Sequence, residues 1–108
     1  MTVELNVPQI VAEARAAAAK ATEQFLQTHG DRDACGFAWL TVYEKGSTKL
    51  GRALIKEGFS KAYSGGLQLW NPSGSYTQAI TAKEEGAIAA ARVFEKHGIK
   101  AYAGSRMD

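Results

Sequence analysis

Four polar side chains in the second half of the chain have the chemistry to bind a small polar ligand. Asn71, Ser73 and Gln78 follow Trp70, and Arg106 belongs to the C-terminal segment. Amide, hydroxyl and guanidinium groups beside an aromatic wall are typical of sites that orient a small polar molecule. The alternative interpretation is a rigid loop, in which the Asn and Ser side chains bond to nearby backbone groups.

A second candidate site lies where a helix is expected to begin. The run Gly46-Ser47-Thr48-Lys49-Leu50-Gly51-Arg52 combines hydroxyl groups and two cations with the backbone N–H groups of a helix start. That combination suits a phosphate or carboxylate, so Ser47, Lys49 and Arg52 are candidate anion ligands. The run is not a P-loop, because the upstream glycine and the four-residue spacing are absent. The alternative is that Ser47 is a simple N-cap and Lys49 is solvated.

Aromatic residues also recur at every second position of the expected strands. Phe37, Trp39 and Tyr43 fall on one side of residues 36–43, because successive side chains of a strand point to opposite faces. Later segments extend this face with Phe59, Lys61, Tyr63, Gln68, Trp70, Lys100 and Tyr102. The opposite face is predicted to be aliphatic and to lie under helices: Ala38, Leu40, Val42, Leu67, Leu69, Ile99 and Ala101.

What covers the aromatic side decides the function. One interpretation is that the N-terminal helix folds over it, and a second is that a homodimer pairs two such faces. A third is a stacking platform for single-stranded nucleic acid, in which the bases stack on the rings and Lys61 and Lys100 contact phosphates. The stacking residues would be Phe37, Trp39, Tyr43, Trp70 and Tyr102. The basic-Gly-aromatic-Gly-aromatic run of RNA-recognition domains is absent, and Cys35-Gly36-Phe37-Ala38-Trp39 keeps only its spacing.

Catalytic and metal-binding patterns are missing from the sequence. Cys35 has no histidine at a recognisable spacing and is expected to be a buried thiol at a strand start. His29 and His97 each precede a helix-ending glycine, where a histidine interacts with the helix C-terminus. We therefore predict no catalytic residue, no metal site and no cofactor. An enzyme acting on a small anionic substrate at a loop end is the remaining alternative.

The elements that position these residues follow from periodicity and turn signals. Helical spacing predicts a first helix that begins near Pro8 and ends at Gly30, with an alanine-rich middle suited to close packing. A second helix is expected after an N-cap at Ser47, and a third after a capping box at Thr81. Strands are expected at residues 36–43, 59–63, 67–70 and 99–103, with a glycine turn at 64–66 and a polar tail at 104–108.

This order predicts an α+β fold. After the first helix it reads strand, helix, strand, strand, helix, strand, which is the split βαβ arrangement of ferredoxin-like folds. Right-handed crossovers would place two helices on one face of a four-stranded antiparallel sheet. We expect a single domain over residues 1–108, with the N-terminal helix in 1–30 and the βαββαβ core in 34–104.

Composition narrows the class of protein. At 108 residues, with 45% hydrophobic and 22% charged residues, the chain is typical of one globular domain. The net charge of +2 permits an anionic partner but is low for a protein that tracks a phosphate backbone. The single cysteine, and the lack of a signal peptide or apolar span, favour a cytoplasmic protein that does not enter membranes.

Four segments resemble a small tailed-bacteriophage protein family of uncharacterised function. They are Cys35-Gly36-Phe37-Ala38-Trp39, Ser47-Thr48-Lys49-Leu50-Gly51-Arg52, Leu69-Trp70-Asn71-Pro72-Ser73-Gly74 and Ala103-Gly104-Ser105-Arg106-Met107-Asp108. The resemblance implies an accessory protein in a bacterial host cytoplasm that binds a host protein or nucleic acid, and it implies no catalytic residue. The leading sequence-based hypothesis is therefore a non-catalytic binding protein that uses the loop, the tail and the Ser47–Arg52 segment.

Overall fold

Three helices and a four-stranded antiparallel sheet make up the computed structural model, which describes residues 6–31, 34–63 and 65–108. In chain order the elements are α1 (Val7–His29), β1 (Gly36–Val42), α2 (Lys49–Lys56), β2 (Ser60–Lys61), β3 (Leu67–Trp70), α3 (Ile80–Lys96) and β4 (Tyr102–Met107). The strand order is β2-β3-β1-β4, with β1 and β3 at the centre. The fold is therefore α+β, as the sequence predicts.

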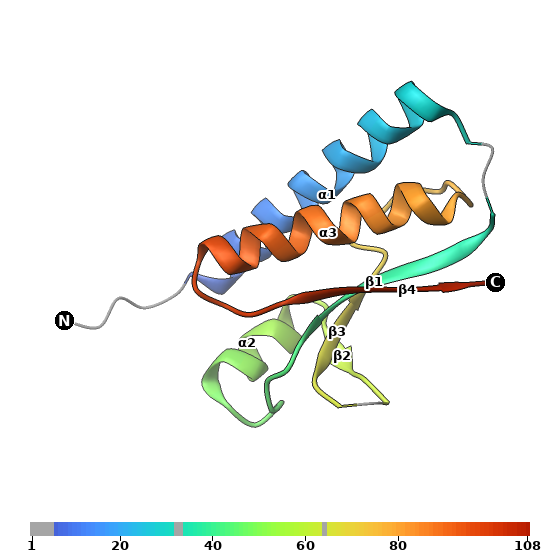
Figure 1. Ribbon diagram of the computed structural model, residues 1–108. Helices are drawn as coiled ribbons and strands as arrows, with labels where there is room; N and C mark the ends of the chain where they lie inside the picture. The colour runs from blue at the N-terminus through green and yellow to red at the C-terminus, as the bar shows by residue number, and fades with distance from the viewer. Residues whose placement is uncertain (1–5, 32–33, 64) are drawn as a thin grey trace.

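All three helices contribute to one core on one face of the sheet. Figure 1 shows α1 and α3 side by side above β1 and β4, with α2 beside β3. The seven residues predicted to lie under helices are each at most 5% exposed: Ala38, Leu40, Val42, Leu67, Leu69, Ile99 and Ala101. Their alternation with less buried residues is the period-2 signal of a strand with one covered face, and the predicted aliphatic face is confirmed.

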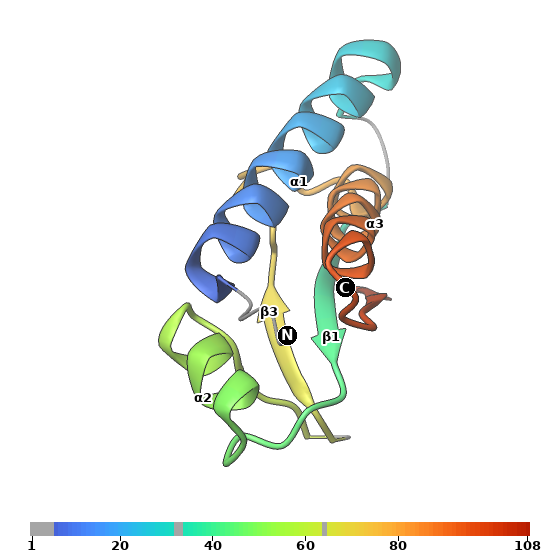
Figure 2. The ribbon, with the colours of Figure 1, turned by 90° about the vertical axis from the view of Figure 1, so that its left-hand side faces the viewer.

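Small residues allow α1 and α3 to approach closely (Figure 2). Ala14 and Ala18 on α1 are fully buried, one helical turn apart. A Cβ on Gly86 of α3 would lie only 3.1 Å from the carbonyl oxygen of Ala18, so that position accepts no side chain without a shift. The buried Thr22 hydroxyl donates a 2.7 Å hydrogen bond to the Ala82 carbonyl oxygen and ties the two helices together.

The interpretation that the N-terminal helix covers the aromatic side of the sheet is wrong. Because α2 has eight residues and is only about 12 Å long, it leaves part of the aliphatic face for another helix. Val7, Ile10 and Val11 of α1 join that core and are each at most 5% exposed. The aliphatic face therefore carries three helices, one more than predicted, and no helix of the described chain packs over the opposite face.

The helix ends follow capping chemistry that was predicted in part from the sequence. Asn6 caps α1 by accepting a hydrogen bond from the Gln9 backbone N–H, with a proline in the first turn as predicted. For α2 the N-cap is Thr48 and not Ser47, because the Thr48 hydroxyl accepts the Gly51 N–H at 3.0 Å. The predicted capping box at Thr81 is also wrong, since the N-cap of α3 is Ala79 and Thr81 lies within the first turn of the helix, which begins at Ile80.

Two strands differ from the predicted ones. β2 is reduced to Ser60–Lys61, and the preceding Phe59 is 3% exposed and stacks on Phe94 in the core instead of on the aromatic side. Lys61 pairs with Leu67 and therefore also leaves the predicted face. β4 begins at Tyr102 and continues to Met107, so the expected tail is a strand paired along β1.

The turn between β2 and β3 agrees with its glycine signal. Gly65 and Gly66 have φ of 109° and 77°, a region that glycine adopts without strain. The first residue of the predicted turn, Ser64, lies outside the described residues. Among the helices of the described chain, none has the length and apolar character needed to cross a membrane.

Candidate functional site

Five aromatic rings lie together on the sheet face opposite the helices. We call them the aromatic face: Phe37 and Trp39 on β1, Trp70 on β3, Tyr102 on β4, and Tyr43 just after β1. The ring centroids of Trp39 and Trp70 are 5.1 Å apart, and Phe37 meets Trp70 edge-on at 6.1 Å. Tyr43 and Tyr102 form a second pair at 5.6 Å. The structure thus brings together all the residues predicted to stack bases.

Strand register explains this arrangement. Trp39 lies opposite Trp70 on one side and opposite Gly104 on the other. A Cβ on Gly104 would lie 2.5 Å from the indole Nε1 of Trp39, so the glycine makes room for the ring. The next row across the sheet holds the polar pair Thr41 and Gln68, about 7 Å away along the strands. This role of Gly104 could not be predicted, since its segment has the composition of a polar tail.

The rings are open to solvent. Tyr43 is 65% exposed, Tyr102 52% and Trp70 46%, while Phe37 and Trp39 are half-buried against their neighbours. Rings that remain this exposed on one sheet face give up favourable burial, and exposed apolar patches mark interaction sites. The aromatic face is therefore the strongest candidate for a binding surface.

Two cations lie at one end of this face. The guanidinium carbon of Arg106 is 5.8 Å from the Phe37 ring centroid, because Arg106 pairs with Phe37 across β1 and β4. The Lys83 ammonium reaches the same ring from α3 at 5.5 Å and donates a 2.9 Å hydrogen bond to the Gly36 carbonyl oxygen. Cations held near an aromatic ring can contact an anion that passes over it. Sequence reasoning missed Lys83, since nothing in a helical pattern relates it to a strand 47 residues earlier.

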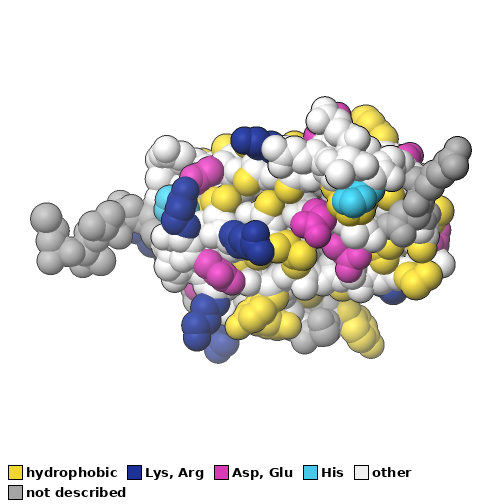
Figure 3. All heavy atoms as spheres, turned by 45° about the horizontal axis from the view of Figure 1, so that its top comes forward, with side chains coloured by type: hydrophobic (Ala, Val, Ile, Leu, Met, Phe, Trp, Pro, Cys, Tyr) yellow, Lys and Arg dark blue, Asp and Glu magenta, His cyan; other side chains and the backbone are white. Residues whose placement is uncertain are grey.

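Basic and acidic side chains are interspersed on the helix side of the molecule, which Figure 3 shows with α1 and α3 turned toward the viewer. Charges of one sign do not gather there. This pattern is typical of a solvated helix surface.

The loop after Trp70 uses most of its polar groups internally. The Asn71 side chain donates to the Ser75 carbonyl oxygen at 3.0 Å, and the Ser73 hydroxyl donates to the Asn71 side-chain oxygen at 3.2 Å. Asn71 also adopts a positive φ of 45°, which asparagine tolerates better than most residues. These contacts are those of the rigid-loop alternative.

The other residues of that predicted site lie apart. A Cβ on Gly86 of α3 would be 3.2 Å from the Ser73 Cβ, which places Ser73 on the helix side. Arg106 lies over Phe37 on the aromatic face, so the structure separates these two residues. Gln78 is exposed, and its backbone carbonyl accepts a hydrogen bond from Gly36.

The predicted anion ligands at the start of α2 are partly engaged. The Arg52 guanidinium donates to the Ser47 carbonyl oxygen at 2.9 Å, and Lys49 is exposed on the first turn. A Cβ on Gly51 would lie 1.9 Å from the Lys45 carbonyl oxygen, so glycine is needed where the loop crosses the helix. Ser47, one of the three predicted ligands, also borders a hollow at the Tyr43 end of the aromatic face.

A hollow of about 580 Å³ lies at the Tyr43 end of the aromatic face. The loop after β1 and the β2–β3 hairpin form its walls. Its described lining is Tyr43, Glu44, Lys45, Gly46, Ser47, Lys61, Ala62, Gly65 and Gly66. Because Tyr43 belongs both to the hollow and to the aromatic face, the two form one continuous surface.

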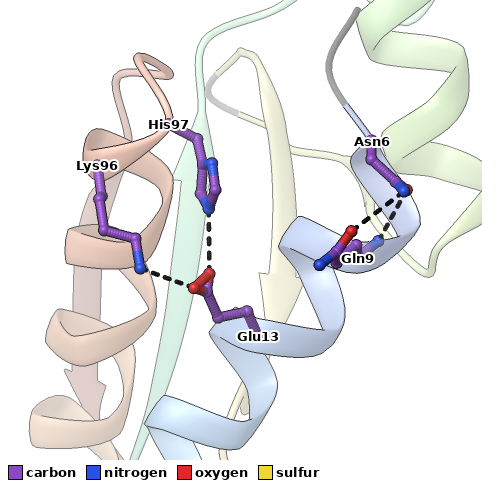
Figure 4. Close-up of polar contacts among 5 residues, drawn as sticks. All are labelled: Asn6, Gln9, Glu13, Lys96 and His97. Atoms are coloured by element: carbon purple, nitrogen blue, oxygen red, sulfur yellow. Dashed lines mark hydrogen bonds and ion pairs between the residues drawn. The ribbon is translucent and has the colours of Figure 1, made fainter.

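Glu13 of α1 forms an ion-pair cluster with Lys96 and His97 at the end of α3, away from the aromatic face (Figure 4). The Glu13 carboxylate accepts hydrogen bonds from Lys96 Nζ at 2.7 Å and contacts His97 Nε2 at 3.0 Å. The hydrogen bond from Lys96, followed by the one from His97, lowers the pKa of Glu13 below its ordinary value of 4.5. Nothing in the sequence relates Glu13 to residues 83 and 84 positions later, so this contact could not be predicted.

We expect Glu13→Gln to lower the free energy of unfolding at pH 7, because the amide replaces the charge that Lys96 stabilises. A carboxyl whose folded-state pKa is lowered stabilises the fold above its unfolded pKa, and this contribution is lost as the pH falls through the lowered value. Urea midpoints of the wild type and the variant should therefore differ at pH 7 and converge in acid below pH 4.5. Glu95→Gln, at an exposed position of α3, is the matched control. A difference in urea midpoint that stays constant with pH would contradict a stabilising role for the ionised Glu13 carboxylate.

Residues with potential for metal or nucleophile chemistry do not cluster. Among the described residues, no group of three or more His, Cys, Asp or Glu side chains is placed to hold a metal ion. Cys35 is exposed, contrary to the expected buried thiol, because it lies at the sheet end beside the α3 start and pairs with Ala79 through the backbone.

No protein-family model matches the chain, and searches of curated proteins and of solved structures give no match.

Proposed function

We propose that the protein binds single-stranded nucleic acid on its aromatic face. The observation that carries this proposal is a group of five neighbouring rings, three exposed and two half-buried, on a sheet face that no helix of the described chain covers. Every nucleobase has a π-face, so such a platform binds bases with little regard to sequence, and each stacked base contributes roughly 1–3 kcal/mol.

The cations near the rings favour a phosphate-bearing partner. Arg106 and Lys83 flank Phe37 at one end, and Lys45 and Lys61 line the hollow at the other. Lys100 is exposed two residues before the ring of Tyr102. A strand that crosses the face from Phe37 to Tyr43 would meet a cation at both ends of its path.

A second copy of the chain fits this face less well. In a two-fold pair the same surface meets itself, so the cationic ends would oppose cationic ends in either alignment of the strands. A polyanion neutralises the same charges. The charge distribution therefore favours nucleic acid over the homodimer.

The topology supports the same proposal. The observed order β2-β3-β1-β4, with β1 and β3 central, is compatible with a ferredoxin-like split βαβ core preceded by α1, and we propose that assignment. RNA-recognition domains use a four-stranded sheet whose aromatic residues stack bases. Here Phe37, Trp39 and Trp70 occupy the two central strands. The hypothesis of a phage-type accessory protein is compatible with this role, since nucleic acid is one of the macromolecules it could bind.

Tryptophan fluorescence tests the proposal directly, because Trp39 and Trp70 are part of the platform. Titration with oligothymidine at low salt should quench the emission. With about three phosphate contacts, log K should fall against log salt with a slope of roughly −2. The same titration with a duplex of equal length is the control, because paired bases cannot stack on the rings.

Unchanged emission at low salt would overturn the proposal. A stable dimer in light scattering, with emission that changes on dilution and not with oligonucleotide, would show that a second copy covers the face.

A further inference from the structure

The hollow beside Tyr43 has a lining that the stacking platform alone does not require. Tyr43 presents an exposed ring, and Glu44 follows it with a half-buried carboxylate. Lys45 and Lys61 reach the hollow from two different segments, and both are exposed. A ring, one acceptor and two cations are thus gathered in a space of about 580 Å³, which is within the usual range for small-ligand sites.

Glycines keep the hollow open. A Cβ on Gly66 would lie 3.0 Å from the Tyr43 ring and 2.9 Å from the Val42 carbonyl oxygen. A Cβ on Gly46 would lie 3.1 Å from the Ile55 side chain and 3.4 Å from Lys61. Larger residues at these positions would narrow the space between the hairpin and the loop after β1.

The three charged groups are open to a ligand. Within the described part of the chain, Glu44, Lys45 and Lys61 make no ion pair with one another or with other side chains. A carboxylate accepts hydrogen bonds from an exocyclic amino group such as that of cytosine, and lysine ammonium groups contact phosphate. The ring therefore matches the face of a base, the Glu44 carboxylate matches its exocyclic amino group, and the two lysines match its phosphate.

We propose that this hollow binds the terminal nucleotide of the strand, an inference that depends on the function proposed above. The base stacks on Tyr43 and donates its exocyclic amino group to Glu44, while its phosphate lies between Lys45 and Lys61. Because Glu44 only accepts hydrogen bonds when ionised, the hollow selects an amino-bearing base over one with a carbonyl group in its place. The platform binds bases without preference, and the hollow adds selectivity at one end.

Cytosine and uracil provide the sharpest test, because they differ in an amino group against a carbonyl at the position that Glu44 would contact. The probes are oligothymidines of about six residues, each with deoxycytidine or deoxyuridine at its 5′ or 3′ end. We expect the deoxycytidine form to bind about fivefold more tightly at one of the two ends, the effect of one added hydrogen bond. The readout is quenching of Trp39 and Trp70, which lie outside the hollow.

Glu44→Gln should abolish the preference while overall binding persists, because the amide both donates and accepts and so tolerates either base. Lys45→Ala combined with Lys61→Ala should make the salt slope shallower by about one unit. Lys56→Ala, at an exposed position of α2 outside the lining, is the matched control and should leave the slope unchanged.

Two results would overturn the inference and leave the platform intact: equal affinity for both bases at both ends, or a preference that Glu44→Gln does not change. If none of the oligonucleotides quenches the emission, the platform and the hollow both fail.

Discussion

Ala18→Glu is expected to lower the free energy of unfolding by about 3–5 kcal/mol, whereas Ala19→Glu changes it by less than about 0.5 kcal/mol. Ala18 is fully buried and Ala19 is exposed on the same helix. A carboxylate at position 18 would be forced into the contact between α1 and α3 without a cation to pair with. At position 19 it would be solvated.

The contact between these helices leaves no space for the added side chain. Ala18 faces Gly86, where even a Cβ would come within 3.1 Å of the Ala18 carbonyl oxygen. One turn further along, the same contact holds the buried hydrogen bond between Thr22 and Ala82. Relaxation would require α1 to separate from α3 and would therefore expose much of the core.

Urea unfolding followed by circular dichroism measures both variants under the same conditions. Because single domains have stabilities of about 5–15 kcal/mol, the Ala18→Glu protein should unfold at a much lower midpoint or already in buffer. Ala18→Ser adds a small polar group and should have an intermediate midpoint. Equal midpoints for the glutamate variants would mean that α1 does not pack on α3 through this face.

Ala18 and Ala19 show how much of this helix packing can be predicted from the sequence. Propensity and the alanine-rich run predict a helix with a close-packing stripe, and both are observed. The stripe itself does not reveal its partner, because a smooth helix surface fits a sheet face as well as another helix. Gly86 and Ala82 make α3 the partner of the stripe, and this role is visible only once α3 lies against α1.

The bounds of β4 were mispredicted for a different physical reason: the strand expected at 99–103 runs instead from Tyr102 to Met107. Strand patterns arise from one buried face, and almost every residue of this edge strand is exposed. Its position is set by backbone pairing with β1, which brings Arg106 opposite Phe37 and Gly104 opposite Trp39. The rings of the candidate site were predictable from alternation in residues 36–43, 67–70 and 99–103, whereas the positions of Arg106 and Lys83 beside Phe37 depend on pairings and helix contacts between distant segments.

The largest effect on binding is expected at Trp70. Trp70→Ala should weaken oligonucleotide binding about 10- to 100-fold, because a stacked base contributes roughly 1–3 kcal/mol. The same change should lower the free energy of unfolding by only about 1 kcal/mol, since the side chain is 46% exposed and its contacts are with Trp39 and Phe37. Binding is measured by the anisotropy of a labelled oligonucleotide, because the substitution removes one of the two tryptophans.

Leu69→Ala is the matched control on the opposite face of the same strand. Leu69 is 4% exposed within the core, so its truncation should lower the free energy of unfolding by about 2–5 kcal/mol. Wherever the Leu69→Ala protein is still folded, its affinity should be unchanged. Trp70→Phe keeps a ring and should restore most of the binding. If Trp70→Ala proves as destabilising as Leu69→Ala, the aromatic face is an interior surface of an assembly, and nucleic acid is not its partner.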